Sequence, residues 1–213
     1  MGRVERRHVF VRSSLRASGS HSLPYTNVDI SIFVGDLTHA PAEALCTSTN
    51  PRLSLMMGTG AAVRDRGGYS ILRECERILD QELGRSGTRA LAPGSACVTT
   101  AGLLPHKRII HCVASDGAHV TSASIIRLCV VNALACADAE ECSTIAMPLF
   151  GTGHARFDFD EALKLMLRTI RETQTRVKRV FIVTNDASRV SGFGLPIELS
   201  QREEAEDPSW FNE

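Results

Sequence analysis

From residue 28 onward the chain alternates short apolar runs with segments of helical periodicity, and this alternation limits its folds more than any other feature. Apolar runs predict strands at 28–34, 44–47, 95–102, 108–114, 144–150 and 179–186. Periodic segments predict helices at 60–66, 70–83 and 122–139, with a last helix after residue 158. Because strands and helices follow one another at this spacing, we expect a single three-layer α/β/α sandwich.

Two of the predicted helices carry signals for where they begin and end. In the segment 70–83, Ser70 is a candidate N-cap and Gly84 a candidate stop. Asp158 and Glu161 have the spacing of a capping box, which places the start of the last helix after Asp158. The apolar side chains predicted to face the core of these two helices are Ile71, Cys75, Ile78, Leu79, Leu163, Met166, Leu167 and Ile170.

The tripeptide Gly-Thr-Gly occurs twice, at 58–60 and at 151–153. Each copy can be an ordinary tight turn, or a loop whose backbone amides bind an anion. The second copy directly follows a predicted strand, where open α/β sheets place their ligands. If both loops reach one pocket, a diphosphate is the group that they fit.

Neither copy belongs to a common nucleotide motif. Val63 and Arg156 stand where a dinucleotide fingerprint needs its third glycine, and no Gly-Lys-Ser/Thr follows a glycine loop. The three lysines lie outside the glycine-rich loops. Backbone amides therefore have to supply most of the contact to phosphate.

Charge and hydropathy give no reason to expect a nucleic-acid or membrane partner. The 213 residues have a formal net charge of zero. The longest apolar candidate, 125–137, contains Arg127 and Asn132 and is too short to span a bilayer. The seven cysteines form no CxxC pair and no set with metal-ligand spacing, so we expect reduced, buried thiols in an intracellular protein, and neither a metal nor a cofactor.

The two ends differ in charge from the middle. We expect a basic N-terminal tail at 1–26, a domain at 27–197 and an acidic C-terminal tail at 198–213, with the N-terminal tail disordered. The alternative for residues 1–26 is an organelle transit peptide. Without one, the protein is expected in the cytoplasm or the nucleus.

At three places the chain resembles a macrodomain. They are VGDLTHAPAEALCTSTNPRLSLMMGTGAAVRDRGG (34–68), IIHCV (109–113) and IAMPLFGTG (145–153), in the order and spacing of that family. The resemblance implies an ADP-ribose-binding module whose central sheet is mixed and lies between layers of helices.

The resemblance also implies roles for individual residues. Asp36 would accept a hydrogen bond from the adenine amino group, and the backbone of Leu37 would lie along the adenine; the alternative for Asp36 is a turn residue. Asn50 would reach the distal ribose; its alternative is a loop residue before Pro51. The two diphosphate loops would be Gly58, Thr59 and Gly60, and Gly151, Thr152 and Gly153.

Several residues depart from the family pattern. Thr47 replaces the first Asn of the family's Asn-Ala-Ala-Asn, and Asn185 stands where many members stack an aromatic ring on the adenine. Phe150 and Phe157 flank the second loop and either pack on a ribose or belong to the core. His111 in the central strand is expected to be a core histidine.

These residues favour a reader that binds ADP-ribose, a related NAD metabolite or mono-ADP-ribosylated protein. The first alternative is a hydrolase that removes ADP-ribose from protein or deacylates O-acetyl-ADP-ribose, with Asn50 holding ribose and water and His154 as general base. Its weakness is that Ala61, Ala62 and Val63 occupy the place where hydrolytic members carry an Asp. The second alternative is a scaffold without ligand.

Overall fold

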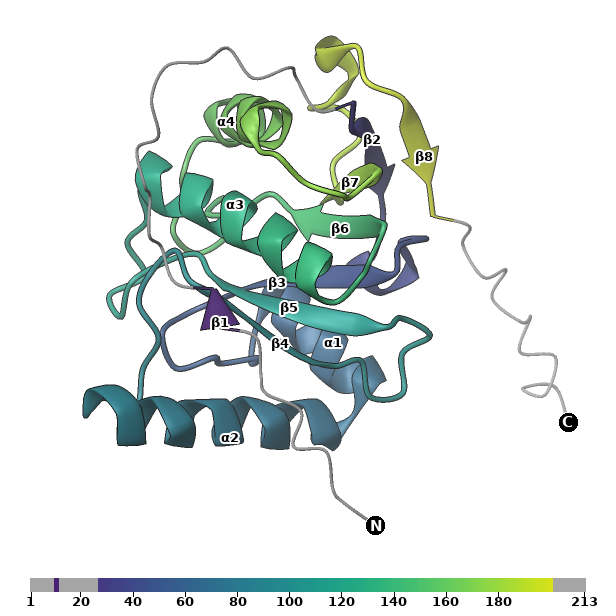
Figure 1. The fold of residues 1–213 in the computed structure, drawn as a ribbon. Helices are drawn as coiled ribbons and strands as arrows, with labels where there is room; N and C mark the ends of the chain where they lie inside the picture. Colours follow the sequence, from purple (N-terminus) through teal and green to yellow (C-terminus); the bar gives the residue numbers. More distant parts are fainter. Residues whose placement is uncertain (1–9, 12–26, 201–213) are drawn as a thin grey trace, which may run out of the picture.

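The computed structural model describes residues 10–11 and 27–200 (Figure 1). Eight strands form one sheet in the order β1-β4-β5-β3-β6-β7-β2-β8. The strands are β1 (Phe10–Val11), β2 (Asp29–Val34), β3 (Ala44–Thr49), β4 (Ala96–Thr100), β5 (Arg108–Val113), β6 (Thr144–Pro148), β7 (Arg179–Thr184) and β8 (Ile197–Leu199). The helices are α1 (Gly58–Gly67), α2 (Tyr69–Ser86), α3 (Ala123–Ala139) and α4 (Phe159–Glu172), with short 3₁₀ turns η1 (Leu37–His39) and η2 (Ser191–Phe193).

The sheet is mixed, as the resemblance implies. Strand β4 runs antiparallel to both of its neighbours, β1 and β5. The other neighbouring pairs are parallel. The carboxyl ends of β2, β3, β6 and β7 therefore meet at one edge of the sheet, and this edge positions the site described below.

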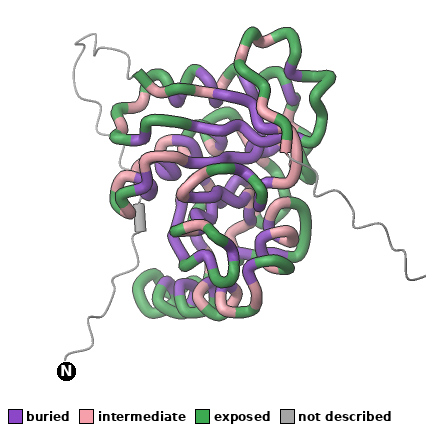
Figure 2. Tube along the Cα trace, turned by 90° about the vertical axis from the view of Figure 1, so that its right-hand side faces the viewer, coloured by how far each residue is buried: buried purple, intermediate pink, exposed green. Residues whose placement is uncertain are grey.

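The helices cover the two faces of the sheet and complete the three layers that the alternation predicts. Helices α3 and α4 lie on one face, and α1 and α2 lie on the other (Figure 1). Each face has its own apolar core. The central strands are buried and the outward sides of the helices are exposed (Figure 2). All apolar side chains predicted to face the core from the second and last helices are buried.

The boundaries of two helices can be compared with their sequence signals. Asp158 is the N-cap of α4, and its carboxylate accepts a hydrogen bond from the amide of Glu161 at 2.9 Å, as predicted. The signals of α2 were misread. Its N-cap is Gly68 rather than Ser70, and the helix continues through Gly84 to Ser86, where the left-handed backbone of the C-cap Gly87 (φ 75°) ends it.

Two strands were not predicted from the sequence. Strand β1 lies within the expected N-terminal tail and pairs with the edge of β4. Strand β8 extends from Ile197 to Leu199, across the expected domain boundary, and pairs with β2. Both are too short to show an alternation of apolar and polar residues. Most of the two expected tails lies outside the described residues.

The cysteines are buried, as the sequence predicts. All seven cysteines are free and buried. Burial raises the pKa of the Cys75 thiol to about 12, so it stays protonated and unreactive at neutral pH. None of the helices within residues 27–200 is long and apolar enough to cross a membrane.

Candidate functional site

A cavity of about 490 Å³ opens at the carboxyl edge of the sheet. Segments that are far apart in the sequence line it: residues 35–37 after β2, 48–50 at the end of β3, 54 and 57 before α1, 114–115 and 119 after β5, 148–149 and 151–155 at and after the end of β6, and 183–185 at the end of β7. The N-terminus of α1 and the first residue of α4 complete the wall. Both Gly-Thr-Gly copies contribute, so the two loops reach one cavity.

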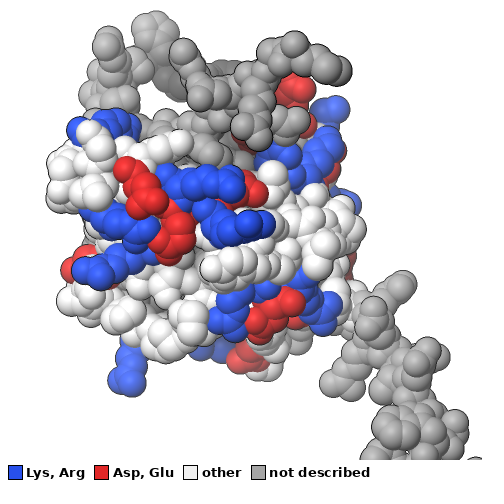
Figure 3. Space-filling view, turned by 90° about the horizontal axis from the view of Figure 1, so that it is seen from below, with Lys and Arg blue, Asp and Glu red and all other residues white. Residues whose placement is uncertain are grey.

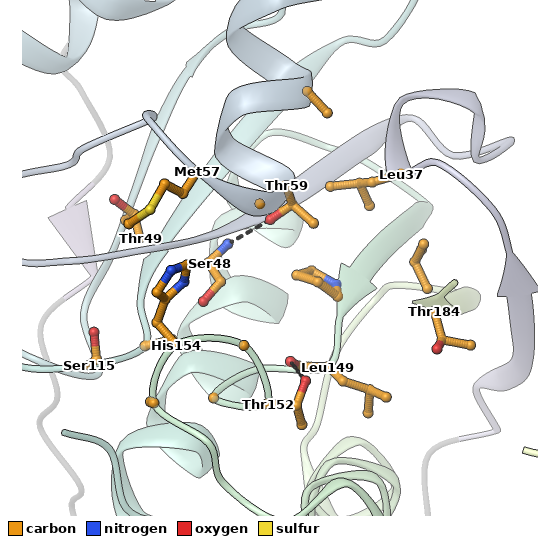
Figure 4. Close-up of a pocket in the computed structure, with 18 of the residues that line it drawn as sticks. Leu37, Ser48, Thr49, Met57, Thr59, Ser115, Leu149, Thr152, His154 and Thr184 are labelled. Atoms are coloured by element: carbon orange, nitrogen blue, oxygen red, sulfur yellow. Dashed lines mark hydrogen bonds between the residues drawn. The ribbon is translucent and has the colours of Figure 1, made fainter. Parts of the chain in front are cut away.

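The first Gly-Thr-Gly is the opening turn of α1. The helix begins at Gly58, whose φ is 57°, and the N-cap Met57 makes no side-chain hydrogen bond to it. The hydroxyl of Thr59 accepts a hydrogen bond from the amide of Ser48 at 3.4 Å and ties the turn to β3 (Figure 4). Gly58 and Thr59 line the cavity, whereas Gly60 packs against Leu55 instead. A helix N-terminus of this kind favours an anion.

The second Gly-Thr-Gly forms a turn between β6 and α4. Gly151 has φ 82°, and the amide of Phe157 donates to its carbonyl at 3.0 Å. The hydroxyl of Thr152 donates to the carbonyl of Leu149 at 2.9 Å. Thr59 and Thr152 lie on opposite sides of the cavity (Figure 4). The two loops are thus placed to hold one group between them.

Asp36 and Leu37 line one end of the cavity. One carboxylate oxygen of Asp36 accepts hydrogen bonds from the amide and the hydroxyl of Thr38, both at 2.8 Å, which caps η1. Its other oxygen lies 3.8 Å from the guanidinium of Arg66. Asp36 is therefore a turn residue and a cavity residue at once, and the second oxygen has room for another donor.

Asn50 lines the cavity near the end of β3. Its side-chain oxygen accepts hydrogen bonds from the amides of Arg52 at 3.0 Å and Ser54 at 3.3 Å. The side chain holds the loop before α1, as its structural alternative predicts. The same contacts fix the position of its NH₂ group, which can donate to a ligand.

For the two aromatic residues that flank the second loop, the structure favours the core alternative. Phe150 is fully buried, and Phe157 packs against the core without lining the cavity. Asn185 lines the wall at the end of β7. Phe159, the first residue of α4, also lines the wall and was not predicted from the sequence. The guanidinium of Arg189 lies 4.2 Å from the centre of the Phe159 ring. Phe159 could have been found from its place, since it starts a helix that follows a phosphate-loop candidate.

Two imidazoles lie at the cavity wall. His154 extends from the second loop toward Ser48 and Met57 (Figure 4). His119, which the sequence analysis also missed, comes from the segment between β5 and α3, and its ring centre is 6.2 Å from that of His154. Asp36, His119 and His154 are the ionisable residues of the cavity wall within the described chain.

His111 is a core residue, as predicted, and is not part of the cavity wall. The hydroxyl of Thr99 donates to the carbonyl of Thr100, so it accepts from Nε2 of His111 at 2.9 Å. The proton of the neutral ring then lies on Nε2, and its Nδ1 accepts from the hydroxyl of Thr47 at 3.1 Å. Burial lowers the pKa of His111 to about 4. Thr47, a departure from the family pattern, is thus explained by this buried imidazole.

Metal-ligating side chains do not gather in the described part of the chain. Residues 10–11 and 27–200 contain no group of three or more His, Cys, Asp or Glu side chains arranged to hold a metal ion. Within the described residues, the cavity wall offers backbone amides, hydroxyl and amide side chains, one carboxylate and two imidazoles.

Comparisons with known proteins agree with this geometry. The Macro domain family model matches residues 46–166. A Macro domain-containing protein of Streptomyces coelicolor is 32% identical over 165 residues, which cover 77% of this chain and 95% of that protein. A protein of Enterobacter sp. named O-acetyl-ADP-ribose deacetylase is 29% identical over 162 residues, with 74% and 87% coverage.

A solved structure supports the same fold. A mutant of the Oceanobacillus iheyensis macrodomain with ADPR superposes with a TM-score of 0.69 at 24% sequence identity. The match covers 76% of this chain and 88% of that one.

Proposed function

The chain belongs to the Macro domain family, and from that premise we propose that its cavity binds ADP-ribose, either free or attached to a protein. The observation that carries the proposal is the meeting of both Gly-Thr-Gly loops in one cavity. A diphosphate placed between them faces the free amides at the start of α1 on one side and the backbone of the second loop on the other.

The two ends of the cavity suit the two ends of the ligand. At one end Asp36 offers a carboxylate oxygen to the adenine amino group, while Thr38 holds the other oxygen in place. At the other end the NH₂ group of Asn50 can donate to a ribose hydroxyl. This assignment of ends follows the family resemblance.

The base has fewer aromatic contacts than in many members of the family. Asn185 offers an amide where a ring would stack. Since base stacking contributes about 1–3 kcal/mol, the affinity should be lower than in members that have the ring, unless Phe159 contacts the base.

The proposal is tested by isothermal titration calorimetry with ADP-ribose. Replacing Asp36 by Ala removes a charge-assisted hydrogen bond of about 1.5–3 kcal/mol, so Kd should rise roughly tenfold to a hundredfold. Asp36→Asn keeps an oxygen for Thr38 but presents an NH₂ group to the adenine amino group, and should also weaken binding. Asp80→Ala, on the exposed side of α2, is the matched control and should bind normally.

Two results would contradict the proposal, wholly or in part. The first is the absence of binding heat with ADP-ribose in a folded protein. The second, unchanged affinity in both Asp36 variants, contradicts only the placement of the adenine beside Asp36 and would leave Asp36 as a turn residue.

A hydrolytic activity is a second candidate, since relatives of about 29% identity are named O-acetyl-ADP-ribose deacetylase. Against it, Asp36 is the only carboxylate of the described cavity wall, and it lies at the opposite end from Asn50 in the proposed pose. His154 is then the candidate base. Release of ADP-ribose from modified protein, or of acetate from O-acetyl-ADP-ribose, measured in wild type and His154→Gln, separates an enzyme from a reader.

A further inference from the structure

The cavity carries little positive charge of its own. The wall, as far as residues 27–200 form it, contains no Lys or Arg. Its one carboxylate, Asp36, lies 3.8 Å from the guanidinium of Arg66, which is outside the wall and offsets the charge of Asp36 rather than that of a ligand. A diphosphate diester has two negative charges at neutral pH, and taking it from water into a protein cavity is costly unless charge or hydrogen bonds compensate. The free amides at the N-terminus of α1 supply a partial positive charge equivalent to about half an elementary charge.

His119 and His154 are the only side chains of the described wall that can become positive. Their ring centres are 6.2 Å apart, with an angle of 43° between the ring planes. His154 directly follows the second Gly-Thr-Gly, and both histidines are exposed residues of the cavity wall. His119 has a left-handed backbone (φ 61°), a conformation that residues other than Gly rarely adopt.

Charged residues lie close to both histidines in the sequence. Asp116 lies in the same segment as His119, but its side chain accepts hydrogen bonds from the amides of Ala118 and Val120. Arg156 and Asp158 follow His154 in the chain; Arg156 is exposed and Asp158 caps α4. None of these three charged residues lines the cavity.

We propose that His119 and His154 form an anion-binding pair that takes up a proton when the diphosphate enters the cavity. The inference rests on the proposed function and deepens it, because it assigns the positive side of the diphosphate site. An anion held beside the two rings attracts a proton to them, because opposite charges attract. Ligand and protons therefore bind together.

The direction of the pH dependence follows from linkage. Histidine changes charge between about pH 5 and pH 8. An anion beside the rings favours their protonated form, so ADP-ribose should bind more tightly as pH falls from 8 to 6. A protonated imidazole cannot accept a proton, so the same inference argues against His154 as general base in the bound complex.

Calorimetry measures the proton uptake directly. ADP-ribose is titrated into the full-length protein near pH 7 in several buffers of different ionisation enthalpy, and the dependence of the observed heat on that enthalpy gives the number of protons. We expect an uptake of about one proton per ligand, and a Kd roughly tenfold lower at pH 6 than at pH 8. The diphosphate of the ligand keeps both charges over this range.

Variants separate this pair from other titrating groups. The double variant His119→Asn with His154→Gln should take up no proton when ADP-ribose binds. Its affinity at pH 6 should equal the lower affinity that the wild type has at pH 8. Asparagine is chosen at position 119 because it tolerates a left-handed backbone. Combining His119→Asn with His154→Lys supplies a fixed charge, which should restore tight binding at pH 8 without proton uptake. Arg156→Gln is the matched control from the same loop and should keep the wild-type proton number.

The inference is overturned if wild type binds ADP-ribose without proton uptake, or if the uptake persists in the double variant. Binding without uptake leaves the proposed function intact. Absence of binding at every pH contradicts both.

Discussion

At the scale of single residues, His111 shows how a buried polar group acquires its place in the core. The ring lies in the middle of β5, and its neutral form is held by the hydroxyls of Thr47 and Thr99. In the folded protein a charged ring would lose its hydration and would gain no carboxylate as partner. Burial therefore disfavours the charged form and lowers the pKa of His111 to about 4.

This gives a prediction for stability against pH. In the unfolded chain the imidazole protonates near its ordinary pKa of about 6.5, so the unfolded state takes up the proton first. The free energy of unfolding should therefore decrease as pH falls from about 6.5 toward 4, by up to about 3 kcal/mol from this residue. Urea denaturation at a series of pH values checks it. In His111→Gln the slope over this range should be reduced, and an unchanged slope would contradict the assignment.

Which residues could be predicted depended on how far apart their contacts lie in the sequence. Asp36, Asn50 and most residues of the two glycine loops could be placed in one cavity because each belongs to a short, continuous motif near the end of a predicted strand, and their roles in binding stay predictions. His119 and Phe159 were missed because their neighbours come from other strands. A signal existed for His119, since it follows a strand whose end was predicted correctly to within a residue.

At the scale of elements, the two Gly-Thr-Gly copies have the same sequence but adopt different local structures. The first is the N-terminal turn of a helix, and the second is a strand-to-helix turn. Within the second, the two glycines are not equivalent. A Cβ at Gly151 would lie 3.0 Å from both Ile126 and Thr121, on a backbone with φ 82°, whereas a Cβ at Gly153 would meet no atom within 4 Å.

The two glycines should therefore respond differently to the same substitution. Gly151→Val should destabilise the fold by at least about 1–2 kcal/mol, because a branched side chain must enter the left-handed region and a packed space. Gly153→Val should leave the unfolding midpoint nearly unchanged and still weaken ADP-ribose binding, since its side chain would stand where phosphate is proposed to approach. Chemical denaturation and calorimetry on both variants measure the two effects. Equal loss of stability, or normal binding by Gly153→Val, would contradict this distinction.

At the scale of the whole molecule, charge and topology set the site apart from the rest of the surface. Positive and negative side chains are interspersed on the face that α2 covers (Figure 3), where Arg89 pairs with Glu76 and Asp80. The cavity lies at the carboxyl edge of the parallel strands and has hardly any charge. The three-layer order was predictable because it follows from alternation. The edge strands were not, because pairing with a neighbour, rather than their own sequence, makes them strands.

The edge strands determine how much of the chain the fold needs. A chain of residues 27–200 keeps all cavity residues and seven strands, and lacks only β1, whose pairing with β4 involves Phe10 and Val11. We expect it to fold and to bind ADP-ribose with unchanged Kd.

A chain of residues 27–196 also loses β8, which pairs with β2 through Ile32, Phe33 and Val34 just before Asp36. That chain should melt at a lower temperature and bind more weakly, because β2 becomes an open edge beside the adenine end. Circular dichroism melts and calorimetry compare the two with the full chain. If residues 27–200 fail to fold, then β1 is needed for the fold. If residues 27–196 melt and bind like residues 27–200, then β8 contributes nothing to stability or to binding.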